Sequence, residues 1–262
     1  MQRVRAVLID IDGVLTLSWE PVSGAIQALR WLRSAGIPFV LVTNTTSRSR
    51  AQIADRLEGQ GFPIGPADIL TAPAIGAAYL RERYPGARCL LINSGDIAAD
   101  LPGVTLTQPG DPAVDVVLIG GAGPEFSYDA LNRAFRHLRD GARLVALSRG
   151  LYWRTREGLQ LDTGAFLPGL EEAGGTAAEV VGKPASEFFA AALAHLEASA
   201  SDALMIGDDI DNDVLAAQRC GLTGVLVRTG KFASRTLSAA IDRPDYVVDS
   251  IADLPSLLER PS

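Results

Sequence analysis

Cysteine, long apolar runs and positive charge are all scarce in this sequence of 262 residues. The two cysteines, Cys89 and Cys220, lie far apart and outside any CxxC pair, which predicts two reduced, structural thiols. No stretch approaches the ~18 consecutive apolar residues of a membrane span. The formal net charge is −7, whereas nucleic-acid-binding proteins typically carry an excess of basic residues. We therefore expect a soluble protein that binds neither membranes nor nucleic acid.

The remaining composition is that of an ordinary globular protein, with 47% hydrophobic and 21% charged residues. A chain of this length can bury a full core without disulfides or a structural metal, in one or two domains. The apolar run near the N-terminus covers only residues 6–9, and Asp10 follows it at once, so it does not match a signal peptide. Together with the reduced thiols, this predicts a cytoplasmic location.

Short apolar strands alternate with helices at both ends of the sequence. Strands are expected at residues 4–9, 39–42, 203–206, 224–227 and 246–248, and helices at 24–34, 49–60, 186–196, 213–220 and 251–258. Uninterrupted apolar strands separated by helices are typical of a parallel sheet that is covered on both faces. The pattern predicts an α/β protein whose core is a doubly wound, Rossmann-like parallel sheet.

The middle of the chain predicts a second set of elements. Helices are expected at 73–84 and 127–139 and strands at 88–92, 114–119 and 143–147, followed by a glycine-rich stretch at 164–175. We interpret this part as an α/β domain inserted between the two halves of the first sheet. The expected boundaries give a core domain of residues 1–73 and 181–262 and an inserted domain of residues 74–180.

Polar side chains follow four of the predicted strands at the point where each strand ends. They are, in chain order, Asp10 and Asp12, then Thr43 and Asn44, then Lys183, which follows a further strand expected at 179–181, and finally Asp208, Asp209 and Asp213. In an open parallel sheet, ligands bind beyond the carboxyl ends of the strands. The sequence therefore predicts that these carboxylates, one hydroxyl, one amide and one lysine converge on one edge of the sheet.

This combination of groups suits the chemistry of phosphate. Several carboxylates in one place repel one another and call for a cation, and oxygen ligands suit Mg²⁺, which takes one or two protein carboxylates and keeps waters and phosphate oxygens. Lys183 supplies a positive charge for an anion. A carboxylate can act as the nucleophile that accepts a phosphoryl group, and a second carboxylate can act as general acid and base.

Each cluster also has a simpler interpretation when it is taken alone. Asp10 and Asp12 are typical of a turn or a helix cap, and Thr43-Asn44 is a common N-cap. Gly182-Lys183-Pro184 reads as a turn with a surface lysine, and residues 208–213 as a solvated acidic loop that caps the next helix. The placement of all four clusters at strand ends, in this order, favours a functional site over four unrelated turns.

The motifs DIDGV, TN, GKP and GDDxxxD, in this order, resemble those of the haloacid dehalogenase superfamily of phosphotransferases. The large insert resembles the α/β cap of the C2 type, which is that of subfamily IIA. The segments VVGKPASEFF, MIGDDIDNDV, AQRCG, VRTGKF and PEFSYDALNRAF are most similar to the phospholysine phosphohistidine inorganic pyrophosphate phosphatase group and its near relatives. Some animal members of that group carry Ser at the position of Asp12.

The resemblance implies a role for each matching residue. Asp10 would be the nucleophile and a Mg²⁺ ligand, and Asp12 the general acid/base with its backbone carbonyl on the metal. The groups that hold and neutralise the phosphoryl group would be Thr43, Asn44 and Lys183. The remaining acidic residues would be a third metal ligand, Asp208, and two residues behind the ligands, Asp209 and Asp213.

The implied reaction is Mg²⁺-dependent hydrolysis of a small phosphomonoester, a phosphoramidate or pyrophosphate through an aspartyl-phosphate. A mutase-type phosphotransferase and a non-catalytic phosphate-binding protein on the same fold are the alternatives. In the inserted domain, Tyr152, Trp153 and Arg154 place a cation beside aromatic rings, which suits a small anionic or planar leaving group; a solvated strand edge is the other interpretation. The expected partner is a small phosphorylated substrate, and a homodimer is compatible with the sequence.

Overall fold

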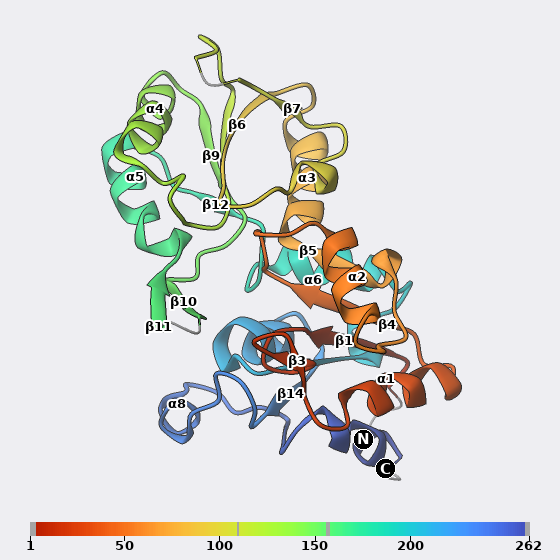
Figure 1. Ribbon diagram of the computed structural model, residues 1–262. Coiled ribbons are helices and arrows are strands. Elements are labelled where there is room, and N and C mark those ends of the chain that lie inside the picture. Colours follow the sequence, from red (N-terminus) through yellow and green to blue (C-terminus); the bar gives the residue numbers. More distant parts are fainter. Residues whose placement is uncertain (1–3, 109, 156–157, 260–262) are drawn as a thin grey trace. The chain divides into compact units, whose positions relative to one another are not determined.

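The computed structural model describes residues 4–108, 110–155 and 158–259, which form two compact units. Within the described part of the chain, the first unit contains residues 4–43, 50–70 and 183–259, and the second contains residues 44–49 and 71–182. The predicted α/β class, with parallel sheets and an inserted α/β domain, is confirmed (Figure 1). Among these residues, no helix has the length and apolar character needed to cross a membrane.

The first unit is built on a six-stranded sheet in the order β15-β14-β13-β1-β4-β5. Its strands are β1 (Ala6–Asp10), β4 (Phe39–Thr43), β5 (Ile69–Thr71), β13 (Ala203–Gly207), β14 (Thr223–Val227) and β15 (Tyr246–Val248). A small hairpin, which the sequence pattern did not predict, consists of β2 (Thr16–Leu17) and β3 (Glu20–Pro21). The pairs from β15 to β4 are parallel, with Ile9 level with Leu41 on one side and Ile206 on the other. The carboxyl ends of β4, β1 and β13 therefore lie together at one edge.

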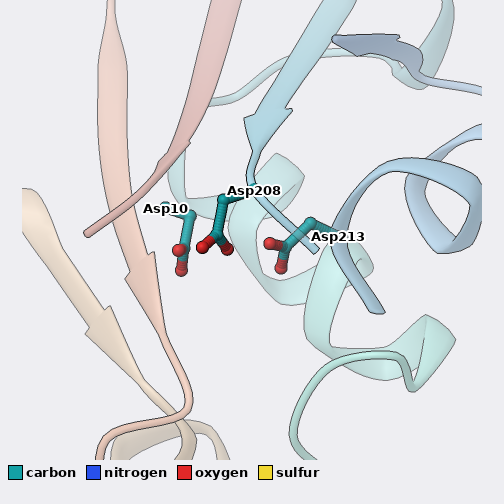
Figure 2. Close-up of side chains that lie close together, drawn as sticks. All are labelled: Asp10, Asp208 and Asp213. Atoms are coloured by element: carbon teal, nitrogen blue, oxygen red, sulfur yellow. The ribbon is translucent and has the colours of Figure 1, made fainter. Parts of the chain in front are cut away.

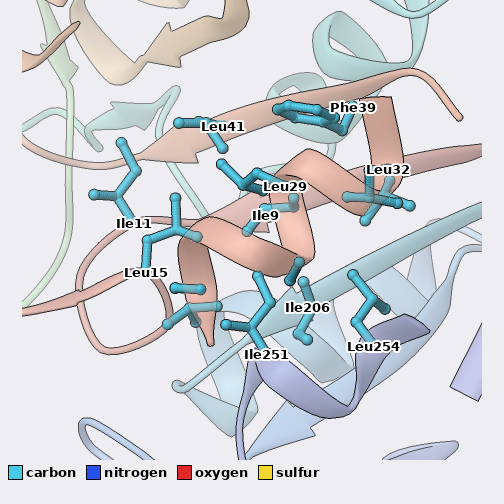
Figure 3. Close-up of a cluster of buried hydrophobic side chains, with 14 of the residues drawn as sticks. Ile9, Ile11, Leu15, Leu29, Leu32, Phe39, Leu41, Ile206, Ile251 and Leu254 are labelled. Atoms are coloured by element: carbon cyan, nitrogen blue, oxygen red, sulfur yellow. The ribbon is translucent and has the colours of Figure 1, made fainter. Parts of the chain in front are cut away.

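Helices cover both faces of this sheet. They are α1 (Ala25–Ser34), α2 (Arg50–Glu58), α6 (Ser186–His195), α7 (Ala216–Arg219), α8 (Ser234–Ala239) and α9 (Leu254–Leu258), with short helical turns at Pro66–Asp68, Ala200–Asp202, Ile210–Leu215 and Ile251–Asp253. Ile9 and Leu41 pack with Leu29 of α1 and Leu254 of α9 in one buried cluster (Figure 3). Leu226 of β14 instead packs with residues of the 210–215 segment, and because alternate residues of a strand face opposite ways, this segment lies on the other face.

The second unit has a five-stranded sheet in the order β12-β9-β8-β6-β7, and all of its pairs are parallel. Its strands are β6 (Arg88–Ile92), β7 (Thr105–Leu106), β8 (Val116–Ile119), β9 (Arg143–Ala146) and β12 (Glu179–Val180). Its helical elements are α3 (Ala72–Arg83), α4 (Tyr128–Arg139), α5 (Leu167–Gly174), and short turns at Ala98–Asp100 and Thr163–Ala165. An antiparallel hairpin of β10 (Tyr152–Thr155) and β11 (Gly158–Leu161) completes the unit.

A hydrogen-bonded cluster joins α3 to β12 within the second unit. Glu179 accepts hydrogen bonds from the hydroxyls of Tyr79 and Tyr84, the latter at 2.6 Å. Burial alone would raise the pKa of the Glu179 carboxyl, but these two hydrogen bonds, together with the charges of Arg143 and Arg83, lower that pKa below its usual value. The ionised form of Glu179 therefore stabilises the fold.

We expect Glu179→Gln to reduce the free energy of unfolding by roughly 1–3 kcal/mol at pH 7, since hydrogen bonds to a charged group are lost. A carboxyl whose pKa is lowered on folding stabilises above its unfolded pKa, and this contribution disappears as the pH falls through its folded pKa. The difference between variant and parent should therefore shrink below about pH 4. Urea unfolding of variant and parent at pH 7 and below about pH 4 measures this difference in the free energy of unfolding. Glu172→Gln, at an exposed position, is the control. An equal difference at both pH values would contradict the assignment.

Candidate active site

The candidate site lies in the first unit, at the carboxyl ends of β1, β4 and β13. Asp10 is the last residue of β1 and Thr43 the last residue of β4, and both are buried. Asp208 directly follows β13, and Lys183 is the first residue of the unit's third chain segment. The parallel register brings these strand ends to the same edge, so residues nearly 200 positions apart in sequence become neighbours.

A buried lysine joins two of the carboxylates. The Nζ of Lys183 lies 2.6 Å from Oδ1 of Asp10 and 2.8 Å from Oδ1 of Asp213. Burial alone would lower the pKa of the Lys183 ammonium, but the charges of Asp10 and Asp213 outweigh it and raise that pKa, so the lysine stays charged. The second oxygen of Asp213 accepts a hydrogen bond from the backbone N–H of Asp209 at 3.3 Å. Both oxygens of Asp213 are thus engaged with protein groups.

Asp10, Asp208 and Asp213 together form a group suited to a metal ion (Figure 2). One carboxylate oxygen from each lies within 4.8 Å of the others, and all three residues are buried. Asp208 keeps one buried oxygen, Oδ1, that has no hydrogen-bond partner. An unpartnered, buried oxygen beside two further carboxylates is the donor set that a hard divalent cation requires.

The electrostatics of the cluster also call for a cation. Burial, followed by the charges of Asp10 and Asp213, raises the pKa of Asp208 to about 8. Burial raises the pKa of Asp213 to about 6 although Lys183 opposes it, and burial likewise raises the pKa of Asp10. One buried lysine therefore leaves the negative charge of three buried carboxylates incompletely balanced.

Asp209 has a different role from its acidic neighbours. Its carboxylate caps the helical segment Ile210–Leu215 by accepting hydrogen bonds from the backbone N–H groups of Asp211 and Asn212 at 3.2 and 3.1 Å. The Nζ of Lys231 lies 3.4 Å from it. These contacts lower the pKa of Asp209 although burial alone would raise it. Of the acidic residues at 208–213, Asp209 is therefore the one that caps the next helical segment.

The other sequence-predicted site residues are placed as follows. Asp12 lies two residues beyond Asp10, in the loop that follows β1, with an exposed side chain. Asn44 begins the short segment of the second unit, where its Oδ1 lies close to the backbone of Gly182. Tyr152 and Trp153 lie on β10 of the second unit, with 60% and 46% of their surface exposed. The side chain of Arg154 lies outside the described part of the structure.

Sequence reasoning missed a contribution from residues 229–231. The backbone N–H of Lys231 donates a hydrogen bond to Oδ2 of Asp208 at 2.7 Å. Residues 229–231 begin two positions after β14 ends at Val227. The rule that identified the other clusters, polar residues just beyond a strand end, also applies here. The position of residues 229–231 beyond β14 is therefore the signal in the sequence that indicates this segment.

Comparisons with known proteins agree with these features. Residues 7–107 match the model of the haloacid dehalogenase-like hydrolases, and residues 180–254 match a second model of the same kind. The chain is 38% identical to the rat haloacid dehalogenase-like hydrolase domain-containing protein 2, over 93% of this chain and 91% of that protein. It is 36% identical to the human phospholysine phosphohistidine inorganic pyrophosphate phosphatase, over 97% and 94%. The solved p-nitrophenyl phosphatase of Archaeoglobus fulgidus superposes with a TM-score of 0.89, at 26% identity over 97% of this chain and 99% of that one.

Proposed function

The chain belongs to the haloacid dehalogenase-like hydrolases and is a phosphoric-ester hydrolase, and we propose that it cleaves small phosphomonoesters, phosphoramidates or pyrophosphate with Mg²⁺. The observation that carries the proposal is the arrangement of Asp10, Lys183 and Asp208. A carboxylate at a strand end lies 2.6 Å from a buried ammonium, beside a second carboxylate with an unpartnered oxygen. This arrangement suits a cation and an anion bound side by side, as phosphoryl transfer requires.

The site fits Mg²⁺ better if two of its carboxylates, and not all three, are ligands of the ion. Both oxygens of Asp213 are engaged, one by Lys183 and one by the Asp209 N–H, whereas Asp208 keeps Oδ1 without a partner. We therefore assign Asp10 and Asp208, with the backbone carbonyl of Asp12, to the metal, and Asp213 to the positioning of Lys183. This agrees with the preference of Mg²⁺ for one or two protein carboxylates. When bound, the ion would neutralise charge on the phosphoryl oxygens.

The protein's own groups divide the reaction into two steps. An oxygen of Asp10 attacks phosphorus and forms an O–P bond while the bond from phosphorus to the leaving group breaks. Asp12, whose exposed side chain lies two residues on, gives its proton to the leaving group. Asp12 then takes a proton from water, whose oxygen attacks phosphorus and releases inorganic phosphate and the free Asp10 carboxylate.

Lys183 and Thr43 prepare the site for this chemistry. The ion pair with Lys183 fixes Oδ1 of Asp10, which orients the carboxylate and leaves Oδ2 as the attacking atom. The fixed ammonium also offsets charge on the phosphoryl group, and fixed charges need no reorganisation during the reaction. The buried Thr43 stands at the end of the adjacent strand, and we assign it and Asn44 to hydrogen bonds with phosphoryl oxygens.

The test is a reaction with ³²P-labelled p-nitrophenyl phosphate and Mg²⁺. We expect release of inorganic phosphate and, after rapid acid quenching, label on the protein of wild type and none on Asp10→Asn. The same assay with sugar phosphates separates hydrolysis from a mutase, which would yield an isomer instead of inorganic phosphate. Product release without labelled protein at any quench time would contradict the aspartyl-phosphate.

We further propose that the second unit acts as the cap, of the C2 type, that determines which substrate is cleaved. The site groups of the first unit account for the phosphoryl group and the cation, and none of them is specific for a leaving group. The β10–β11 hairpin carries an unusual set of exposed apolar side chains for a surface element, namely Tyr152, Trp153, Leu159 and Leu161. These side chains suit contact with a planar or apolar leaving group.

Replacing Tyr152 and Trp153 together by alanine should change the ranking of substrates by kcat/KM. For at least one pair of substrates, the ratio of their kcat/KM values should change at least about fivefold, since contacts of this kind discriminate between substrates by about 1–3 kcal/mol. The dependence on Mg²⁺ should stay the same. Tyr128→Ala is the matched control, because Tyr128 is an aromatic residue of the same unit with 80% of its surface exposed. An unchanged ranking across a panel of phosphates would remove the hairpin from substrate selection.

A further inference from the structure

The segment Thr229, Gly230 and Lys231 lies just beyond the carboxyl end of β14 and contacts Asp208. The backbone N–H of Lys231 donates a hydrogen bond to Oδ2 of Asp208 at 2.7 Å. Oδ1 of the same carboxylate is buried and has no partner, and Asp208 as a whole is only 3% exposed. One oxygen is therefore fixed by the protein and the other is left for a ligand.

Two glycines enclose the fixed oxygen closely. A Cβ at Gly13 would lie 1.9 Å from Oδ2 of Asp208, and a Cβ at Gly230 would lie 2.0 Å from the same atom. A Cβ at Gly230 would also lie 2.6 Å from the Cα of Gly13. Both glycines have positive φ, +91° and +62°, a conformation that other residues adopt only with strain. Any side chain at either position would occupy the space of the carboxylate.

A further hydrogen bond connects the two loops that carry these glycines. The hydroxyl of Thr229 donates to the backbone carbonyl of Gly13, which lies three residues after Asp10. The backbone N–H of Gly13 in turn donates to the carbonyl of Thr16 at 2.7 Å. The loop after β14 is thereby tied to the loop that follows Asp10, and it is also tied to Asp208 by the Lys231 N–H.

We propose that the 229–231 segment is a positioning element that holds Oδ2 of Asp208 so that Oδ1 serves the divalent cation. The proposal rests on the metal-dependent function proposed above. Mg²⁺ demands nearly ideal octahedral geometry, so a ligand that is free to rotate binds it less well than one that is fixed. Groups that orient a metal ligand typically contribute roughly 10–100-fold to metal affinity.

The test is Gly230→Ala, measured by calorimetric titration of the full chain with Mg²⁺ alone. We expect the Kd for Mg²⁺ to rise at least about tenfold and the half-saturating Mg²⁺ concentration in the phosphatase assay to rise by the same factor. At saturating Mg²⁺ most of kcat should return. The matched control is Gly36→Ala, because Gly36 has a similar φ of +66° but a Cβ added there would meet nothing within 4 Å, so it brings the strain without the clash. Its Mg²⁺ affinity should equal that of wild type.

Two further variants separate the contacts of the segment. Thr229→Val removes the hydroxyl that ties the two loops, keeps the shape of the side chain, and should weaken Mg²⁺ binding by roughly two- to tenfold. Lys231→Ala keeps the backbone amide and removes the ammonium that lies 3.4 Å from Asp209, so the contact to Asp208 remains and the affinity for a cation should not fall. If Gly230→Ala does not fold, Thr229→Val decides the question.

Wild-type Mg²⁺ affinity in folded Gly230→Ala, or in Thr229→Val where Gly230→Ala does not fold, overturns the positioning role and leaves the proposed function intact. A wild-type chain that neither binds Mg²⁺ nor hydrolyses phosphates would overturn both proposals. Circular dichroism of each variant confirms that the measured loss belongs to a folded protein.

Discussion

Asp10→Asn should lower kcat by a factor on the order of 10³ or more while the protein remains folded, as is typical when a nucleophile is removed. The amide has nearly the size of the carboxylate but is a poor nucleophile, and it is a weaker partner for the ammonium of Lys183, which lies 2.6 Å from Oδ1. The measurement is phosphate release from p-nitrophenyl phosphate with saturating Mg²⁺.

The fold should survive because Asp10 lies in a cluster whose carboxylates carry more negative charge than the buried Lys183 balances. Burial raises the pKa of the Asp10 carboxyl, so its ionised form is not a strong source of stability, and Lys183 keeps Asp213 as a partner at 2.8 Å. Asp55→Asn is the matched control, since Asp55 lies exposed on α2 and should keep full activity. More than about 10% activity in folded Asp10→Asn would assign the nucleophile elsewhere.

The strand-end pattern predicted part of what the structure places together, since Asn44, which follows the same strand as Thr43, belongs to the second unit. Asp10, Thr43, Lys183 and Asp208 were predicted to converge because parallel strands place their carboxyl ends at one edge, and the structure brings all four into the first unit. The pattern could not divide roles within the acidic loop. Asp209 and Asp213 are both aspartates of the same loop, so the sequence does not distinguish them. Their contacts in the structure do, because Asp209 caps the helical segment and Asp213 pairs with Lys183.

Boundaries that depend on contacts between distant residues could not be read from the sequence. Residues 44–49 belong to the second unit, where the Asn93 side chain donates a hydrogen bond to the carbonyl of Thr46 at 2.9 Å. No local pattern in the segment indicates this. The helix Leu167–Gly174, in contrast, was hidden in a glycine-rich stretch although it carries recognisable signals, a proline in its first turn and the left-handed Gly175 after its end.

Removing Mg²⁺ with a chelator should abolish turnover, and Ca²⁺ should not restore it. Without a cation, the phosphate dianion meets buried carboxylates that Lys183 balances only in part, so both binding and reaction are disfavoured. Ca²⁺ is larger, takes more oxygen ligands and favours bidentate carboxylates. If both oxygens of Asp10 coordinate the ion, neither is free to attack phosphorus, and Ca²⁺ should inhibit in competition with Mg²⁺.

Thermal stability separates binding of the ion from catalysis by it. Any cation that binds only the folded state stabilises it, by about 2.7 kcal/mol at a concentration of about 100 Kd. Mg²⁺ and Ca²⁺ should therefore both raise the Tm, although only Mg²⁺ supports turnover. Asp208→Asn should remove both increases, because the carboxylate with the unpartnered Oδ1 is replaced by a neutral amide that binds a cation more weakly, whereas the Asp55→Asn control should keep them. Full activity in the chelator, or equal activity with Ca²⁺, would show that the carboxylate cluster serves a purpose other than a catalytic magnesium site.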